Sequence, residues 1–177
     1  MAIKYFTKSE ARAAAKTSTV IKSAKQVITE AQRAASDTDR FDVFLSHAKI
    51  DAELVLGVKK LLEREGKSVY VDWENDAQLD RTHVTSETAD LLRRRMRQSS
   101  TLLYIATEAS SSSKWMPWEL GYFDGYRPNT VAILPLMDNA NDRFDGQEYL
   151  GLYPKVTKDT LENATSESVF VEDLKKR

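Results

Sequence analysis

The 177-residue sequence contains no cysteine and only two histidines, His47 and His83. The absence of cysteine excludes disulfides, thiolate catalysis, iron–sulfur clusters and cysteine-based zinc sites. Two histidines are too few for a histidine-rich centre, so we expect no metal. No run of about eighteen apolar residues occurs, so we expect no membrane contact. A cysteine-free chain is compatible with a reducing compartment, and we expect a cytoplasmic location.

Glycine is also scarce, and the six glycines form none of the familiar nucleotide-binding motifs. Neither GxGxxG nor GxxxxGK[ST] occurs, so the usual phosphate cradles of hydride transfer and P-loop phosphoryl transfer are missing. The GxSxG nucleophile elbow is absent as well. Ser46 and His47 are sequence neighbours, which rarely face each other as nucleophile and base. The sequence therefore favours none of these chemistries.

Charge is distributed unevenly along the chain although its formal net value is only −1. A near-zero net charge argues against a general nucleic-acid binder, which is usually basic. The first forty residues contain eight basic and four acidic residues, whereas the remainder contains 18 and 23. The early segment lacks an apolar secretory core, and its acidic residues count against a transit peptide. We therefore separate an N-terminal extension, residues 1–39, from a domain over residues 40–177.

The extension is expected to contain a helix over residues 18–35, because its apolar residues recur at helical spacing. Two and a half heptads are too few to define a coiled coil. The favoured interpretation is a helix that packs its apolar stripe on its own domain. An oligomerisation arm is the alternative.

The domain alternates β-rich runs with amphipathic helical patterns. The expected strands are 41–46, 68–72, 101–106, 130–135 and, more weakly, 150–156. The expected helices are 51–65, 86–98, 115–126 and, more weakly, 166–176. Such alternation is typical of βαβ units and a parallel sheet. Right-handed crossovers then predict an α/β fold, a flavodoxin-like, doubly wound sheet of five strands in the order 2-1-3-4-5.

Sheets of this kind bind ligands at the carboxyl ends of the strands, where the strand order reverses. In the predicted order, this crevice lies between the first and third strands. The segments Ser46–Asp51 and Thr107–Glu119 open onto it. The polar loop over residues 74–84 borders it and is longer than most connections, which favours a functional role.

The most unusual segment runs from Lys114 to Gly125 and is rich in aromatic residues. Pro117 suits a first helical turn, and Trp115 and Glu119 share a helix face because they are four residues apart. A carboxylate among aromatic rings is partly desolvated and becomes a stronger partner for a cation. The alternative is that the aromatic residues fill the core while Glu119 caps the helix or points to solvent.

Three segments together resemble TIR domains. The run Phe41–His47 resembles the opening strand of these domains, and Tyr70–Trp73 with its polar loop looks like their second strand and BB loop. The spacing of Trp115 and Glu119 matches the WxxxE pattern of bacterial and plant TIR domains with enzymatic activity. The resemblance covers about residues 40–156 and is nearest to stand-alone bacterial TIR proteins, some of which act in anti-phage defence and innate immunity.

The resemblance implies cleavage of NAD+ at the nicotinamide–ribose bond, with NAD+ as substrate and no further cofactor. The products would be nicotinamide and ADP-ribose, or a cyclic ADP-ribose-type signal. By resemblance, Glu119 is the catalytic glutamate and Trp115 belongs to the same site. Nicotinamide leaves NAD+ as a neutral molecule, so no general acid is required. One carboxylate that stabilises the oxocarbenium-like ribose suffices, and such a group is typically worth about 3 kcal/mol.

Other residues are expected near the nucleotide because of their positions. Ser46 and His47 end the first strand, and His47 either contacts the nucleotide or caps the following helix. Asp72 and Trp73 end the second strand, where Asp72 either holds a ribose hydroxyl or caps a loop.

The remaining candidates lie on the long loop and on the aromatic helix. Arg81 and His83 either meet the diphosphate or belong to a solvated loop, and Tyr122 lies one turn beyond Glu119. The arginines of the expected helix 86–98 are predicted to form a solvated face, with an assembly surface as the alternative. They are residues 93, 94, 95 and 97.

Two classes of function follow from the resemblance. The first is an NAD+-consuming enzyme that self-associates through its BB loop, residues 74–84, and whose product is sensed by a downstream effector. The second is a non-catalytic TIR–TIR interaction module, since fold alone does not fix function. Glu119 favours the enzyme. A receiver-like domain is less favoured, because the chain has Ser46-His47-Ala48 where an acidic cluster would be required.

Overall fold

The computed structural model describes residues 4–21, 35–76, 79, 82–83 and 85–162. Its strands are β1 (Phe6–Thr7), β2 (Phe41–Ser46), β3 (Val69–Tyr70), β4 (Ser99–Ala106) and β5 (Val131–Met137). Its α-helices are α1 (Lys8–Ile21), α3 (Ala52–Arg64), α4 (Asp72–Asn75), α5 (Ser86–Arg97), α6 (Trp115–Tyr126) and α7 (Lys158–Glu162). Three 3-10 helices complete the fold, η1 (Lys49–Asp51), η2 (Ala109–Ser112) and η3 (Glu148–Leu152).

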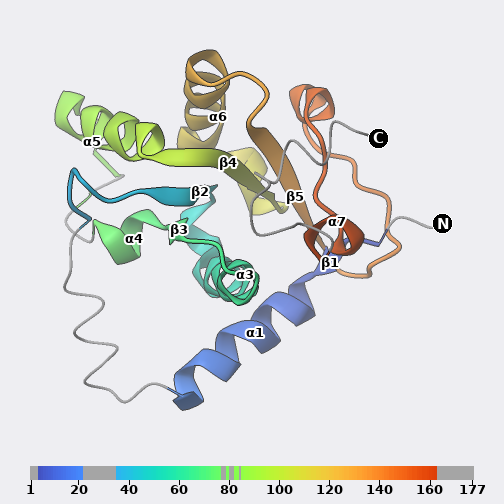
Figure 1. Ribbon diagram of the computed structural model, residues 1–177. Coiled ribbons are helices and arrows are strands. Elements are labelled where there is room, and N and C mark those ends of the chain that lie inside the picture. The colour runs from blue at the N-terminus through green and yellow to red at the C-terminus, as the bar shows by residue number, and fades with distance from the viewer. Residues whose placement is uncertain (1–3, 22–34, 77–78, 80–81, 84, 163–177) are drawn as a thin grey trace.

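The strands form one parallel sheet in the order β1-β5-β4-β2-β3 (Figure 1). Between β2 and β4 the register pairs Val43 with Thr101 and Ser46 with Tyr104. The doubly wound parallel fold is confirmed, and so is the predicted arrangement of the four strands from β2 to β5. The reversal of strand order falls between β2 and β4, as the sequence predicts.

The prediction of a fifth strand at residues 150–156 is wrong. The first residues of this range lie in η3, and Lys155 makes only a single parallel bridge to Ile133. The edge position beside β5 is instead occupied by β1, where Phe6 pairs with Leu136. The N-terminal extension therefore contributes a strand to the sheet.

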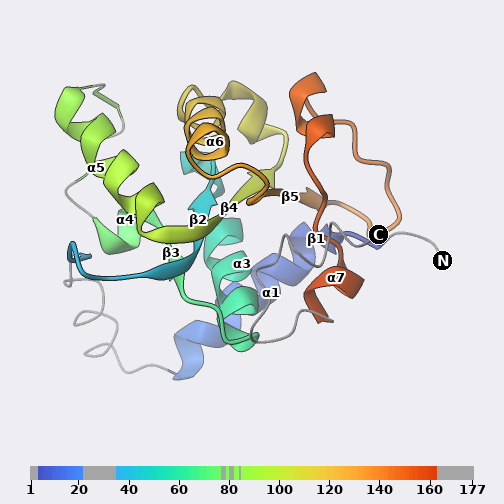
Figure 2. The same ribbon diagram turned by 45° about the horizontal axis from the view of Figure 1, so that its top comes forward.

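Helix α1 follows β1 and packs against α3 (Figures 1 and 2). The approach is close at Gly57, where a Cβ atom would lie 1.8 Å from the carbonyl oxygen of Ala11. The helix predicted over residues 18–35 falls mostly on residues 22–34, which lie outside the described residues. The helix predicted over residues 166–176 also lies outside them.

The alternating side chains of the strands divide the core between the two faces of the sheet. Val43 and Leu45 join an apolar cluster with residues of α1 and α3. Phe44 and Tyr104 join a second cluster with residues of α5 and α6. Figures 1 and 2 show α1 and α3 together on one side of the sheet and α5 and α6 on the other.

Local signals account for the helix ends. Thr85 begins α5, and its hydroxyl accepts a hydrogen bond from the Thr88 amide at 3.1 Å. Gly66 follows α3 with a φ of 75°, a conformation that glycine adopts without strain. Helix α6 begins at Trp115, and its Met116 amide donates to Ser113 at 3.3 Å. These ends place Glu119 in the second turn of α6.

Candidate active site

The candidate site lies at the carboxyl ends of β2 and β4, on the face that α6 covers. Ser46 is the last residue of β2 and is fully buried. Its hydroxyl donates a hydrogen bond of 2.6 Å to Oε2 of Glu119. Glu119 has no exposed surface, so the alternative that it faces solvent is wrong. A buried carboxylate keeps its full electrostatic strength, because little water screens it.

His47 continues the chain from Ser46 and connects the site to α4. Its Nδ1 donates to the Leu45 carbonyl at 2.8 Å, and its Nε2 lies 3.3 Å from Oδ1 of Asp72. His47 and Asp72 are both buried. The same Asp72 oxygen accepts the Trp73 amide at 2.8 Å, while the Trp73 side chain is exposed. The structure thus joins Ser46 to Glu119 and its neighbour His47 to Asp72.

The aromatic residues of α6 form a ladder of rings. Trp115 meets Trp118 edge to face at 5.4 Å, and Trp118 stacks on Tyr122 at 5.9 Å. Tyr122 in turn stacks on Tyr126 at 6.4 Å. The ladder extends along α6 from the turn that holds Glu119 to the end of the helix. It places Tyr122 between two other rings, whereas Trp115 stays at the start of the helix.

The arginines of α5 do not form the single solvated face that the sequence predicts. Arg93 lies 5.3 Å above the Trp118 ring, and Arg97 lies 5.9 Å from the Tyr122 ring. Arg94 pairs with Asp37. Arg95 is buried, with only 4% of its side chain exposed. The run therefore divides into three environments.

The loop over residues 74–84 is described only in part, and Arg81 lies outside the described residues. Its first residues belong to α4, where the Glu74 carboxylate pairs with Lys59 of α3. Burial acts to lower the pKa of Lys59, but the carboxylates of Glu74 and Glu63 outweigh it and hold this pKa above its usual value. His83 is exposed and lies 3.2 Å from the Thr82 hydroxyl.

Sequence reasoning missed the hydroxyl group of Tyr104, whose pKa responds to Glu119. Tyr104 on β4 points to the same face as Ser46 and is fully buried. Burial raises the pKa of Tyr104, and the neighbouring Tyr149 hydroxyl and the Glu119 carboxylate add to the rise. The sequence could have indicated this residue, because Tyr104 alternates with Leu102 along the strand and so lies on the α6 side of the sheet.

A cavity of about 370 Å³ lies between the segments that follow β4 and β5. Its lining includes the hydroxyls of Thr107 and Ser110 and the apolar side chains of Phe144 and Leu150. The Thr107 hydroxyl also donates to Asp51 at 2.6 Å. Asp51 lies in η1, so this bond ties together the segments that follow β2 and β4.

In the parts of the chain that the structure describes, no three His, Asp or Glu side chains gather as a metal site would require. Within the same residues, no helix combines the length and apolar character needed to cross a membrane.

The fold and this site define a family. The TIR domain family model matches residues 43–164 of the chain. The chain belongs to the TIR domain family. Its N-terminal strand β1 and the whole of helix α1 lie before the matched segment.

Two curated proteins are similar to the chain. The "Probable 3' cyclic ADP-D-ribose synthase ThsB'" of Bacillus cereus (strain MSX-D12) is 46% identical over 155 residues, which are 87% of this chain and 80% of the relative. The "Putative cyclic ADP-D-ribose synthase TIR2" of Cytobacillus dafuensis is 31% identical over 83 residues, which are 46% of this chain and 22% of the relative.

Among solved structures, the TIR domain of the Toll-related receptor TRR-2 from Hydra magnipapillata matches with a TM-score of 0.48 and 16% identity. The match covers 77% of this chain and 96% of that domain.

Proposed function

We propose that the chain cleaves the nicotinamide–ribose bond of NAD+ and makes a cyclic ADP-ribose-type product, with Glu119 as the catalytic carboxylate. The observation that carries this proposal is the buried 2.6 Å hydrogen bond from Ser46 to Glu119 at the carboxyl edge of the sheet. The similarity to the Bacillus cereus protein supports the same activity, since that relative is named a cyclic ADP-ribose synthase.

The chemistry requires little more than one fixed negative charge. When the C–N bond breaks, its electron pair moves onto the pyridinium ring, and nicotinamide leaves as a neutral molecule. The ribose then carries positive charge at its anomeric carbon. A preorganised carboxylate at that position stabilises the transition state without solvent reorganisation. Ser46 fixes the orientation of Glu119 through the hydrogen bond it donates.

The second step decides the product. A hydroxyl of the same ADP-ribose closes a ring when it attacks the anomeric carbon, whereas water gives linear ADP-ribose. Either nucleophile releases one proton as the new C–O bond forms, and Glu119 is the proposed acceptor. Trp115 is proposed to stack on a ring of the nucleotide and to exclude water, which favours ring closure.

The full burial of Glu119 has a consequence for substrate access. NAD+ reaches this carboxylate only after side chains at the carboxyl edge move aside. The described form is therefore proposed to be a resting one, with opening linked to self-association that involves residues 74–84. NAD+ is a cytoplasmic metabolite, so we place the enzyme there, in bacterial defence with an effector that senses its product.

The test is turnover of NAD+ by the purified full-length chain over a range of protein concentrations, with products separated by mass and retention time. We expect nicotinamide and a cyclic product, and a loss of about a hundredfold to a thousandfold in kcat for Glu119→Gln. Asp124→Asn is the matched control on α6, because this carboxylate accepts a hydrogen bond from Tyr153 and an amide oxygen can replace it.

Two results would contradict the proposal. Turnover retained by Glu119→Gln would remove this carboxylate from the reaction. A wild-type chain that self-associates at high concentration yet leaves NAD+ intact would favour the non-catalytic interaction module instead.

A further inference from the structure

A buried ion pair lies outside the candidate site, between α5 and the end of α4. Arg95 donates to both carboxylate oxygens of Asp76, from Nε at 2.7 Å and from Nη2 at 2.9 Å. The Tyr70 hydroxyl adds a third hydrogen bond to Asp76 at 2.8 Å. Asp76 has no exposed surface. Such a pair is stable only because nearly every donor and acceptor has a partner.

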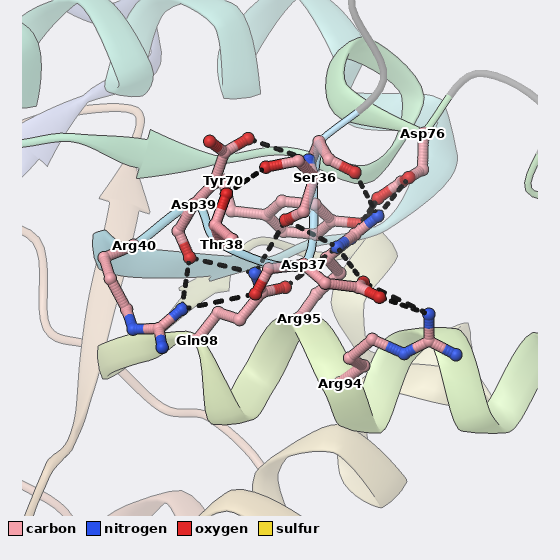
Figure 3. Close-up of polar contacts among 11 residues, drawn as sticks. Ser36, Asp37, Thr38, Asp39, Arg40, Tyr70, Asp76, Arg94, Arg95 and Gln98 are labelled. Atoms are coloured by element: carbon pink, nitrogen blue, oxygen red, sulfur yellow. Dashed lines mark hydrogen bonds and ion pairs between the residues drawn. The ribbon is translucent and has the colours of Figure 1, made fainter.

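The same arginine holds the linker, by which we mean residues 35–40, immediately before β2 (Figure 3). Arg95 donates to the carbonyls of Ala35 at 2.5 Å and Ser36 at 3.2 Å. Gln98, one turn further along, donates to the carbonyls of Ser36 at 2.8 Å and Asp39 at 2.9 Å. The backbone of the linker is thus held by two side chains at the end of α5.

Short contacts connect the linker and the ion pair to the catalytic edge through α4. The Ala35 amide donates to the Asn75 carbonyl at 2.8 Å, and the Asp76 amide donates to the Asp72 carbonyl at 2.7 Å. At the other end of α4, the Asp72 carboxylate lies 3.3 Å from His47 Nε2. Four residues of helix therefore separate the buried ion pair from the residue that follows Ser46.

A helix of four residues does not hold its position by its own hydrogen bonds, because one turn fixes several backbone angles in return for very few bonds. Helix α4 therefore depends on anchors at its two ends. His47 meets Asp72 at the first end, and Arg95 and Ala35 hold Asp76 and Asn75 at the second. When the second end is released, the Lys59–Glu74 pair and the His47 contact remain, and we expect Asp72 to shift relative to His47.

We propose that Arg95 is a positioning residue for NAD+ cleavage, because together with the linker it fixes α4 and so holds Asp72 and His47 beside the Ser46–Glu119 pair. Arg95 touches neither the substrate nor the reacting atoms in this proposal. Only the kinetic part of its test rests on the function proposed above.

The two histidines of the chain provide a direct readout. In a ¹H–¹³C spectrum of the imidazole groups, His47 reports on α4, while His83 is exposed and serves as the internal reference. We expect Arg95→Gln to shift the His47 signal and to leave the His83 signal in place. Arg95→Lys retains the positive charge but cannot make both hydrogen bonds to Asp76, and we expect an intermediate shift of the His47 signal. Arg94→Gln, which removes only an exposed pair, is the matched control and should leave both signals unchanged.

Kinetics of the full-length chain form the second part of the test. Displaced catalytic groups lower kcat, so we expect Arg95→Gln to lose about tenfold to a hundredfold in kcat. KM should change by less than about threefold, because the variant misplaces groups that act in the transition state and removes no contact to substrate. Arg95→Lys should recover part of the loss.

The proposal is overturned if folded Arg95→Gln has an unchanged His47 signal, whatever its activity. If the wild-type chain does not turn over NAD+, the proposed function fails while the spectrum still decides the positioning role. Should Arg95→Gln not fold, Gln98→Ala takes its place, since it removes two bonds to the linker and one from Arg95 Nη1 but keeps both bonds from Arg95 to Asp76. It should shift His47 in the same direction and cost about threefold in kcat, and an unmoved His47 would equally refute the proposal.

Discussion

Helices α1 and α3 cover one face of the sheet and α5 and α6 cover the other, but the two faces bury different kinds of residue (Figure 2). The cluster on the α1–α3 face consists of apolar side chains from β1 to β5 and the two helices. The α5–α6 face buries Asp76, Arg95 and Glu119 beside its apolar residues. An isolated buried charge is costly, so each of these groups has a partner.

The two faces therefore differ in their roles: one mainly stabilises the fold, and the other also buries the residues of the candidate site. The α1–α3 face gains stability mainly from burial of apolar area, with ion pairs only at its rim. The α5–α6 face uses part of its core for charged groups, which lower stability unless hydrogen bonds offset their desolvation. Substitutions on the two faces should therefore differ in whether they change stability or activity.

The largest expected effect is the separation of activity from stability at Glu119. Glu119→Gln should lose at least a hundredfold in kcat, equivalent to about 3 kcal/mol of transition-state stabilisation. Its Tm should stay within about 2 °C of the wild type or rise, because the amide has the same shape and removes a buried charge. Thermal unfolding beside the NAD+ assay measures both. A large fall in Tm would show that the charge also stabilises the fold.

On the opposite face, Gly57→Ala should lower stability and leave activity unchanged. The new Cβ would meet backbone atoms of Ala11, so α1 has to move away from α3. We expect a loss of about 3 kcal/mol and a fall in Tm of roughly 6–12 °C, with unchanged activity per folded molecule. Gly121→Ala in α6 is the matched control, since nothing lies within 4 Å of its added Cβ. It should gain about 0.5–1 kcal/mol.

Much of the fold is predictable because long elements carry strong periodicity. The strands from β2 to β5 and the helices α3, α5 and α6 follow the predicted pattern closely. The edge strand is different. Phe6 and Thr7 are two residues, too few to show alternation, and only pairing with Leu136 and Met137 defines them as a strand. The run at 150–156 forms part of η3 and a single bridge to β5 and not a strand, because β1 pairs along the same edge of β5.

The candidate site divides in the same way. The positions of Ser46 and Glu119 are predictable, since Ser46 ends a strand and Glu119 lies one turn into a helix at the carboxyl edge. Asp76 and Arg95, which form the buried ion pair outside the candidate site, are not predictable, because a run of arginines usually indicates a solvated face. Helical spacing held the missing signal: Arg95 is three residues after Leu92 and next to Met96, both of which are buried.

A smaller effect is expected at Ser46, which can be compared with a second buried serine that bonds to a helix of the same face. Ser46→Ala removes a hydroxyl donor from the buried Glu119 carboxylate, and we expect a loss of about 2 kcal/mol in stability and about tenfold in kcat. Ser99→Ala is the matched control. Its hydroxyl is equally buried but donates to the neutral Arg95 carbonyl at 2.9 Å, so its loss should be about 1 kcal/mol. If urea unfolding shows the same loss of unfolding free energy for Ser46→Ala and Ser99→Ala, the charge of Glu119 does not strengthen the Ser46 hydrogen bond.

The smallest effect concerns the surface at the start of α1. Glu10 accepts hydrogen bonds from Lys158 and Thr7. Burial acts to raise the pKa of Glu10, but these bonds outweigh it and hold the pKa below the usual value of 4.5. A carboxyl group whose pKa is lowered by folding stabilises the native state above its unfolded-state pKa. This contribution is lost as the pH falls through the folded-state value.

Because both partners are partly exposed, with 24% and 43% of their side chains accessible, the contribution should stay below about 1 kcal/mol. Urea unfolding of Glu10→Gln should therefore fall short of the wild type by this amount at pH 7, and the difference should shrink progressively below pH 4.5. Glu53→Gln, which removes a more exposed carboxylate that pairs with Arg12 on the same face, is the comparison variant. A difference for Glu10→Gln that persists at pH 3 would mean that packing of the side chain, rather than its charge, attaches α1 to α7. In that case the α1–α3 face would depend on apolar contact even at its polar rim.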